Sequence, residues 1–171
     1  MWILGNDYRN KSPLHGAYPP NFLRRVVSMF PDAWNVLHLF SGSLTKEQLD
    51  EVHGEGVRHT RFDLRRDGIR DPDVKGDAEK LSSYFLYGGF DLVIADPPYT
   101  DEDAQRYGTP MVNRNKVVQE VSKKLRKGGH LVWLDQVLPM YRKDELHMWG
   151  AIGLVRSTNH RFRVVGMFEK L

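Results

Sequence analysis

Short apolar runs recur along the chain, and amphipathic stretches separate them. Leu92–Ala95 is apolar without alternation, which is typical of a strand that is buried on both faces, as in a parallel sheet. Val36–Phe40 and His130–Asp135 are also predicted strands. Two further candidates, Val57–Asp63 and Asp73–Ala78, each carry an acidic residue at or near the end. The pattern therefore predicts five strands before the last part of the chain.

The stretches between these strands carry helical signals. In several of them the apolar residues recur every three or four positions, which predicts a helix that covers one face of a sheet. Thr45 with Gln48 three positions later fits a capping box at a helix start. The helices predicted in this way are Asn21–Phe30, Thr45–His53, Glu79–Tyr87, Val117–Lys127 and a short one around Lys143–Trp149.

The alternation of strands and helices predicts an α/β domain with a parallel sheet. Two late segments, Ala151–Arg156 and Arg161–Phe168, flank the polar Ser157–His160 and predict a terminal hairpin. Gly128-Gly129 is expected to end the helix Val117–Lys127, whose basic residues would complement the helix C-terminus. With 171 residues and 40% hydrophobic content, the chain suits one well-cored domain, residues 1–171.

Composition narrows the classes of function. The chain has no cysteine, which excludes disulfides and thiolate chemistry. It has no apolar run long enough for a bilayer and no signal-peptide layout, so we expect no membrane association and a cytoplasmic location. The net charge of +3 and the pI of about 9.1 mildly favour a polyanionic partner. The histidines do not fall at ligand spacings on one element, so no metal is expected.

The stretch Asp91–Tyr99 carries the candidate chemistry. Pro97 and Pro98 cannot continue a central strand, so the strand stops at Asp96, where ligands of open α/β sheets bind. The Asp96 carboxylate and the Pro97 carbonyl can each accept a hydrogen bond from an exocyclic NH2 group, and Tyr99 can stack on its ring. An ordinary Asp-Pro turn with a packed tyrosine is the alternative interpretation.

Asp96-Pro97-Pro98-Tyr99 resembles motif IV of the S-adenosylmethionine-dependent amino-methyltransferases. These enzymes methylate adenine N6 or cytosine N4 in DNA, with relatives that act on RNA bases and on protein glutamine, and the Asp form is most typical of the adenine N6 enzymes. The resemblance implies a class I methyltransferase (Rossmann-like) domain with a mostly parallel seven-stranded sheet and a C-terminal antiparallel hairpin. It also implies S-adenosyl-L-methionine as cofactor and DNA, or RNA, as partner.

A cofactor motif is expected upstream in such a family. Phe40-Ser41-Gly42 resembles its Phe-x-Gly core, with two departures: His38 stands where the family usually has an acid, and Leu44 where a second glycine is common. Asp63 follows the turn by about 20 residues, the spacing of an acid that meets ribose hydroxyls, with an exposed loop aspartate as the alternative. Asp77 matches the acid that accepts from the cofactor's adenine amino group, although it could equally cap a helix. The expected cofactor-binding residues are His38, Phe40, Ser41, Gly42, Asp63, Asp77 and Asp96.

The resemblance implies methyl transfer to adenine N6 in DNA, with Asp96, Pro97, Pro98 and Tyr99 as catalytic residues. An RNA adenine or cytosine N4 methyltransferase, a protein methyltransferase and a nucleic-acid-binding relative without cofactor affinity are the alternatives. The polar segment Thr100–Pro110 is placed either to close over a target base or to form a surface loop. Too few residues remain for a target-recognition domain, which predicts relaxed specificity, a homodimer or a specificity partner.

Overall fold

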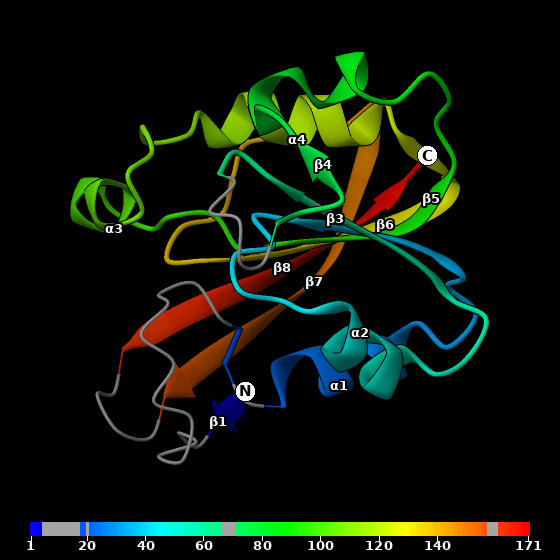
Figure 1. Ribbon diagram of the computed structural model, residues 1–171, viewed down its shortest axis with the longest axis horizontal. Helices are drawn as coiled ribbons and strands as arrows, with labels where there is room; N and C mark the ends of the chain where they lie inside the picture. The colour runs from blue at the N-terminus through cyan, green and yellow to red at the C-terminus, as the bar shows by residue number, and fades with distance from the viewer. Residues whose placement is uncertain (5–17, 20, 66–70, 157–160) are drawn as a thin grey trace.

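The computed structural model describes residues 1–4, 18–19, 21–65, 71–156 and 161–171. These residues form one α/β domain around an eight-stranded sheet with the order β1-β7-β8-β6-β5-β2-β3-β4 (Figure 1). The strands are β1 (Trp2–Leu4), β2 (Asn35–Leu39), β3 (Arg58–Asp63), β4 (Val74–Lys75), β5 (Phe90–Ala95), β6 (Leu125–Asp135), β7 (Leu146–Arg156) and β8 (Phe162–Lys170). The helices are α1 (Phe22–Met29), α2 (Lys46–His53), the 3-10 helix η1 (Ala78–Ser83), α3 (Asp101–Arg106) and α4 (Arg114–Ser122).

Two hydrophobic layers enclose the sheet. Every residue of β5 is buried, and successive side chains of the strand enter opposite layers. Val93 packs in the layer that holds residues of η1 and α4, whereas Ile94 packs in the layer of α1 and α2. The two layers lie on opposite sides of the sheet, with α4 facing away from α1 and α2 (Figure 1). Burial on both faces explains why the central strands lack polar alternation.

The predicted α/β class and the mostly parallel sheet are confirmed. Only β8 runs antiparallel to its neighbours, β6 and β7, and the predicted terminal hairpin is the pair β7 and β8. Its turn, Ser157–His160, lies outside the described residues. The sheet has eight strands rather than seven because Trp2–Leu4, which the apolar pattern did not assign, pairs in parallel with β7.

The boundary between α4 and β6 differs from the prediction. The helix ends at Ser122, and the chain continues as a strand from Leu125, so Arg126 and Lys127 do not complement the helix C-terminus. Gly128-Gly129 lies within β6, where the register against β5 shifts between Phe90 and Leu92. A Cβ at Gly129 would lie 2.7 Å from the Phe90 carbonyl oxygen, so the glycine permits a close approach of two backbones.

Three other elements differ in type. The predicted helix Glu79–Tyr87 is the shorter 3-10 helix η1, the region of Lys143–Trp149 enters strand β7, and the polar segment Thr100–Pro110 contains the helix α3. The capping box of Thr45 and Gln48 is present at the start of α2, as predicted. None of the helices that the structure describes has the length and apolarity that a membrane span requires.

Asp91 joins three strands at the end of the sheet opposite the carboxyl end of β5. Its buried carboxylate accepts hydrogen bonds from the backbone N–H groups of Trp34 (3.0 Å) and Asn35 (2.8 Å), where β2 begins. The other oxygen accepts from Nε of Arg126 in β6. One carboxylate on β5 therefore fixes the starts of both flanking strands.

We expect Asp91→Ala to lower the free energy of unfolding by about 3 kcal/mol, because two backbone donors and a guanidinium lose their acceptor. Urea unfolding followed by circular dichroism measures this loss. Glu51→Ala is the matched control, since it removes the largely exposed Arg24–Glu51 pair and should leave stability unchanged within error. Equal losses in the two variants would contradict this role of Asp91.

Candidate active site

A cavity of about 530 Å³ opens at the carboxyl ends of β2, β3, β4 and β5. In the sheet β2 lies between β3 and β5, so the strand order reverses its direction at β2. Open α/β sheets bind ligands at such a switch point. Most of the residues expected to act together line this cavity. They are Phe40, Gly42, Asp63, Asp77, Asp96, Pro97, Pro98 and Tyr99.

The turn after β2 forms one wall of the cavity. Phe40 and Gly42 both have positive φ angles, of 57° and 51°, so the chain reverses sharply at the end of the strand. The Gly42 N–H donates to Oδ2 of Asp63 at 2.8 Å, which ties the turn to the end of β3. Ser41 is 2% exposed and does not line the cavity, while its N–H donates to the Phe62 carbonyl. The backbone at Gly42 is thus open to close approach by a ligand.

Two carboxylates on neighbouring strand ends face the cavity. Asp63 follows the turn at the spacing noted in the sequence, and its Oδ1 accepts from the Arg65 N–H at 3.0 Å. Asp77 caps η1, since its Oδ1 accepts from the Glu79 N–H at 2.9 Å, and it also lines the cavity. The two interpretations of Asp77 are therefore compatible, because Oδ1 caps the helix while Oδ2, which lies 3.9 Å from Nζ of Lys80, keeps lone pairs for a further donor.

Asp96 lies at the boundary between the core and the cavity. The Tyr99 hydroxyl donates to its Oδ1. Burial raises the pKa of Asp96 to about 7, although the hydrogen bond from Tyr99 and the positive charge of Arg163 act in the opposite direction. Burial, followed by the charge of Asp96, raises the pKa of Tyr99, so this hydroxyl remains a donor. The turn thus holds a carboxylate that titrates near neutral pH.

Two arginines that sequence reasoning did not assign to the site hold Tyr99 in place. The guanidinium carbon of Arg163 lies 4.4 Å from the centroid of the Tyr99 ring and covers one of its faces. Arg114 donates from Nη2 to the Tyr99 carbonyl at 2.9 Å and pairs with the fully buried Asp135 at 2.6 Å. Arg163 of β8 therefore covers the ring, and Arg114 of α4 holds the backbone of the same residue. No local signal in the sequence marks either arginine.

The segment after the turn Asp96–Tyr99 forms another wall of the cavity. Tyr107, Thr109, Pro110, Met111 and Val112 follow α3 and line the cavity. The Arg65 guanidinium lies 5.3 Å from the centroid of the Tyr107 ring, so this wall contacts the residues that follow β3. The segment Thr100–Pro110, interpreted from the sequence either as a loop that closes over a target base or as a surface loop, thus contributes three residues to the lining.

Two positions that depart from the family pattern lie away from the cavity. His38 is fully buried beside His53 and His59, and it does not line the cavity, so it is not placed to contact a ligand there. Leu44 packs in the core layer of α1 and α2, and its N–H donates to the Ser41 carbonyl at 3.0 Å. Neither side chain obstructs the turn at Gly42.

No model of a known protein family matches the sequence, and neither does any protein of curated function. Solved methyltransferase structures resemble the fold. TrmN from Thermus thermophilus is 18% identical, with a TM-score of 0.67 over 92% of this chain, which spans 50% of that protein's chain. The N-methyltransferase NodS from Bradyrhizobium japonicum, solved with S-adenosyl-L-homocysteine, is 14% identical, with a TM-score of 0.53 over 86% of this chain and 83% of its own.

An rRNA methylase from Streptococcus thermophilus is 12% identical, with a TM-score of 0.51 over 86% of this chain and 93% of its own. At these identities the likeness concerns the fold alone. The Rossmann-like methyltransferase fold that the resemblance implied is thereby confirmed.

We expect Asp96→Asn to stabilise the protein at neutral pH. The unfolded carboxyl ionises near 3.8, whereas the folded group stays protonated up to about pH 7, so the wild type loses stability as the pH rises between these values. The variant carries no such group, so its stability advantage over the wild type should be absent near pH 3.5 and reach the order of 4 kcal/mol at pH 8.

Urea unfolding at the two pH values measures this difference. Asp101→Asn, which removes an exposed carboxylate from α3, is the control and should follow the wild type at both. If Asp96→Asn changes the free energy of unfolding equally at both pH values, the raised pKa of Asp96 is wrong.

Proposed function

We propose that this protein transfers the methyl group of S-adenosyl-L-methionine to an exocyclic amine of a nucleic-acid base, foremost adenine N6 in DNA. The observation that carries the proposal is the turn Asp96–Tyr99, where a largely desolvated carboxylate and an aromatic ring that Arg163 covers on one face both line one cavity. Such a pair suits a planar group that carries an NH2.

The residues that line the cavity suit the cofactor in their chemistry. Gly42 allows close approach of the backbone, Asp63 is placed for ribose hydroxyls and Asp77 for the adenine amino group. Phe40 and Ala78 supply apolar surface. When bound, the cofactor supplies a methyl group already activated by the sulfonium. The acidic lining is also favourable for a cationic cofactor.

Asp96 and the Pro97 carbonyl would hold the target amine. Their hydrogen bonds would draw the nitrogen lone pair out of conjugation with the ring and orient it for in-line attack. After transfer the nitrogen carries an extra proton, which Asp96 can accept. Because Arg163 covers one face of Tyr99, only the other face of the ring is left for a stacked base. The base would therefore stack on one side of the ring only.

A nucleic-acid-binding relative without cofactor affinity was the alternative suggested by His38 and Leu44. Both side chains pack in the core, and the Gly42 N–H donates to Asp63, so neither departure obstructs the turn that we propose to hold the cofactor. For a protein methyltransferase, Asn would be more typical than Asp96.

RNA is the second candidate substrate, with the same chemistry and with cytosine N4 as a further target. The rRNA methylase among the similar folds supports it. A homodimer or a specificity partner remains part of the proposal.

We expect the purified protein to transfer labelled methyl groups from S-adenosyl-L-methionine to unmethylated genomic DNA as N6-methyladenine. DNA, total RNA and protein are offered in parallel. Asp96→Ala should reduce transfer by about 100-fold or more, because it removes the acceptor of the reacting amine. Asp101→Ala is the matched control and should retain wild-type activity.

Label only in RNA or protein would overturn the substrate and keep the chemistry. If no acceptor is labelled and calorimetry detects no cofactor binding, the proposed function is wrong.

We also expect kcat/KM to rise with pH and to level off above about pH 7, because the ionised form of Asp96 is the stronger acceptor and kcat/KM follows the free enzyme. Tyr99→Phe keeps the ring but removes a hydrogen bond that lowers the pKa of Asp96, so it should move the midpoint to higher pH. Initial rates measured between pH 5 and 9, at substrate concentrations below KM, test the profile of the wild type and the shift in Tyr99→Phe. An unchanged midpoint in Tyr99→Phe would contradict the role given to the hydroxyl.

A further inference from the structure

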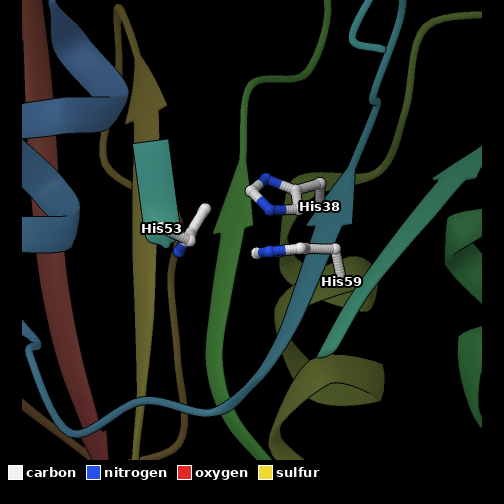
Figure 2. Close-up of side chains that lie close together, drawn as sticks. All are labelled: His38, His53 and His59. Atoms are coloured by element: carbon white, nitrogen blue, oxygen red, sulfur yellow. The ribbon is translucent and has the colours of Figure 1, made fainter. Parts of the chain in front are cut away.

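Three histidines from three separate elements meet on the side of the sheet that α2 covers. His38 comes from β2, His59 from β3 and His53 from the last turn of α2 (Figure 2). One ring nitrogen of each lies within 4.8 Å of one ring nitrogen of the other two. The ring centroids are 4.3 Å apart for His53 and His59, and 5.4 and 5.9 Å from His38 to each of them. Spacing along one element could not reveal such a group.

The parallel register of β2 and β3 brings two of them together. His59 pairs with Val36, and His38 pairs with Arg61, so both histidines lie on the same face of adjacent strands. Val36 packs in the layer of α1 and α2, which identifies that face. Fully buried Leu49 anchors α2 against it and holds His53 over the strands.

In this packing most ring nitrogens of the three histidines lack a hydrogen-bond partner. Five of their nitrogens are buried without a hydrogen-bond partner: both of His38, both of His59 and Nε2 of His53. A neutral imidazole has one donor and one acceptor, and each that stays unpaired in the core costs free energy. A chain that only needed to fill this space would gain stability from apolar residues.

The rings are held in the state that metal ions bind. Burial, and then the neighbouring histidines and Arg61, lowers the pKa of His38 well below its usual range. Burial and His59 lower the pKa of His53 to about 4, and burial is the largest cause of the lowered pKa of His59. All three imidazoles are therefore neutral near pH 7, with lone pairs available for coordination.

We propose that His38, His53 and His59 bind one divalent transition-metal ion through one nitrogen each. Three imidazoles suit zinc, nickel or copper, whereas calcium and magnesium prefer oxygen ligands. Tetrahedral zinc, with bonds of about 2.0–2.1 Å, holds its nitrogen ligands roughly 3.4 Å apart, so small rotations of the rings suffice. Water would complete the coordination, since the described residues supply no fourth ligand to this group.

The proposed metal site would stabilise the turn at Gly42 without lining the cavity. His38 precedes Gly42 and His53 follows it, and the cavity lining includes neither histidine. An ion bound to both would join the two ends of the segment that carries the turn and fix α2 to the sheet. This is a structural role, independent of the proposed reaction.

The test uses untagged, chelator-treated full-length protein and zinc chloride as the probe. We expect one zinc per chain by mass spectrometry, a micromolar or lower dissociation constant against a chromophoric chelator, and a rise in melting temperature on zinc addition. Cobalt chloride should give the visible bands of a tetrahedral nitrogen site. His53→Gln and His59→Gln should each weaken zinc binding more than about 100-fold and abolish the thermal shift.

His147→Gln, which removes an exposed histidine of β7, is the matched control and should bind zinc as the wild type does. Circular dichroism establishes that each variant is folded, and His53→Gln, at the end of a helix, is the variant least disruptive to the core. Zinc binding that survives both cluster substitutions, or that is weaker than millimolar in the wild type, would overturn the proposal.

Discussion

The burial of β5 on both faces is the constraint on which the rest of the structure depends. A strand enclosed in this way needs a helical layer on each side, and it cannot pair through proline, so Pro97 turns the chain out of the sheet at a fixed point. Asp96 is thereby held at the boundary between core and solvent. The raised pKa of Asp96 and the position of Tyr99 both follow from the point at which the strand must end.

The features that the sequence predicted well are those in which a local pattern agrees with the tertiary environment. The buried strands, the capped helix α2 and the terminal hairpin each carry their own signal, and the residues Asp96–Tyr99 are contiguous. The carboxyl ends of parallel strands share one edge, so Asp63 and Asp77 could also be placed at the site from their positions in the chain. Order and periodicity suffice for such features.

The features that were missed depend on pairings between distant residues. Arg163 of β8 contacts the Tyr99 ring, and Arg114 bonds to both Tyr99 and Asp135. The spacing of these residues along the chain does not predict the contacts. The histidine group forms only through the register of two strands and the placement of a helix. The predicted end of α4 was wrong because Gly128-Gly129 is a common helix stop signal. Here the pair lies within β6, where Gly129 permits close approach of the β5 backbone.

The pairing of β1 with β7 has a consequence for how the molecule folds. Trp2–Leu4 completes the sheet beside Leu154–Arg156, so β1 must wait for a partner strand that is synthesised much later. The β2–β3–β5 core can assemble from nearer segments before that time. Closing so long a loop is entropically costly, which predicts slow folding with a late docking step at this edge of the sheet. During synthesis, the apolar residues of β1 remain exposed until that step is complete.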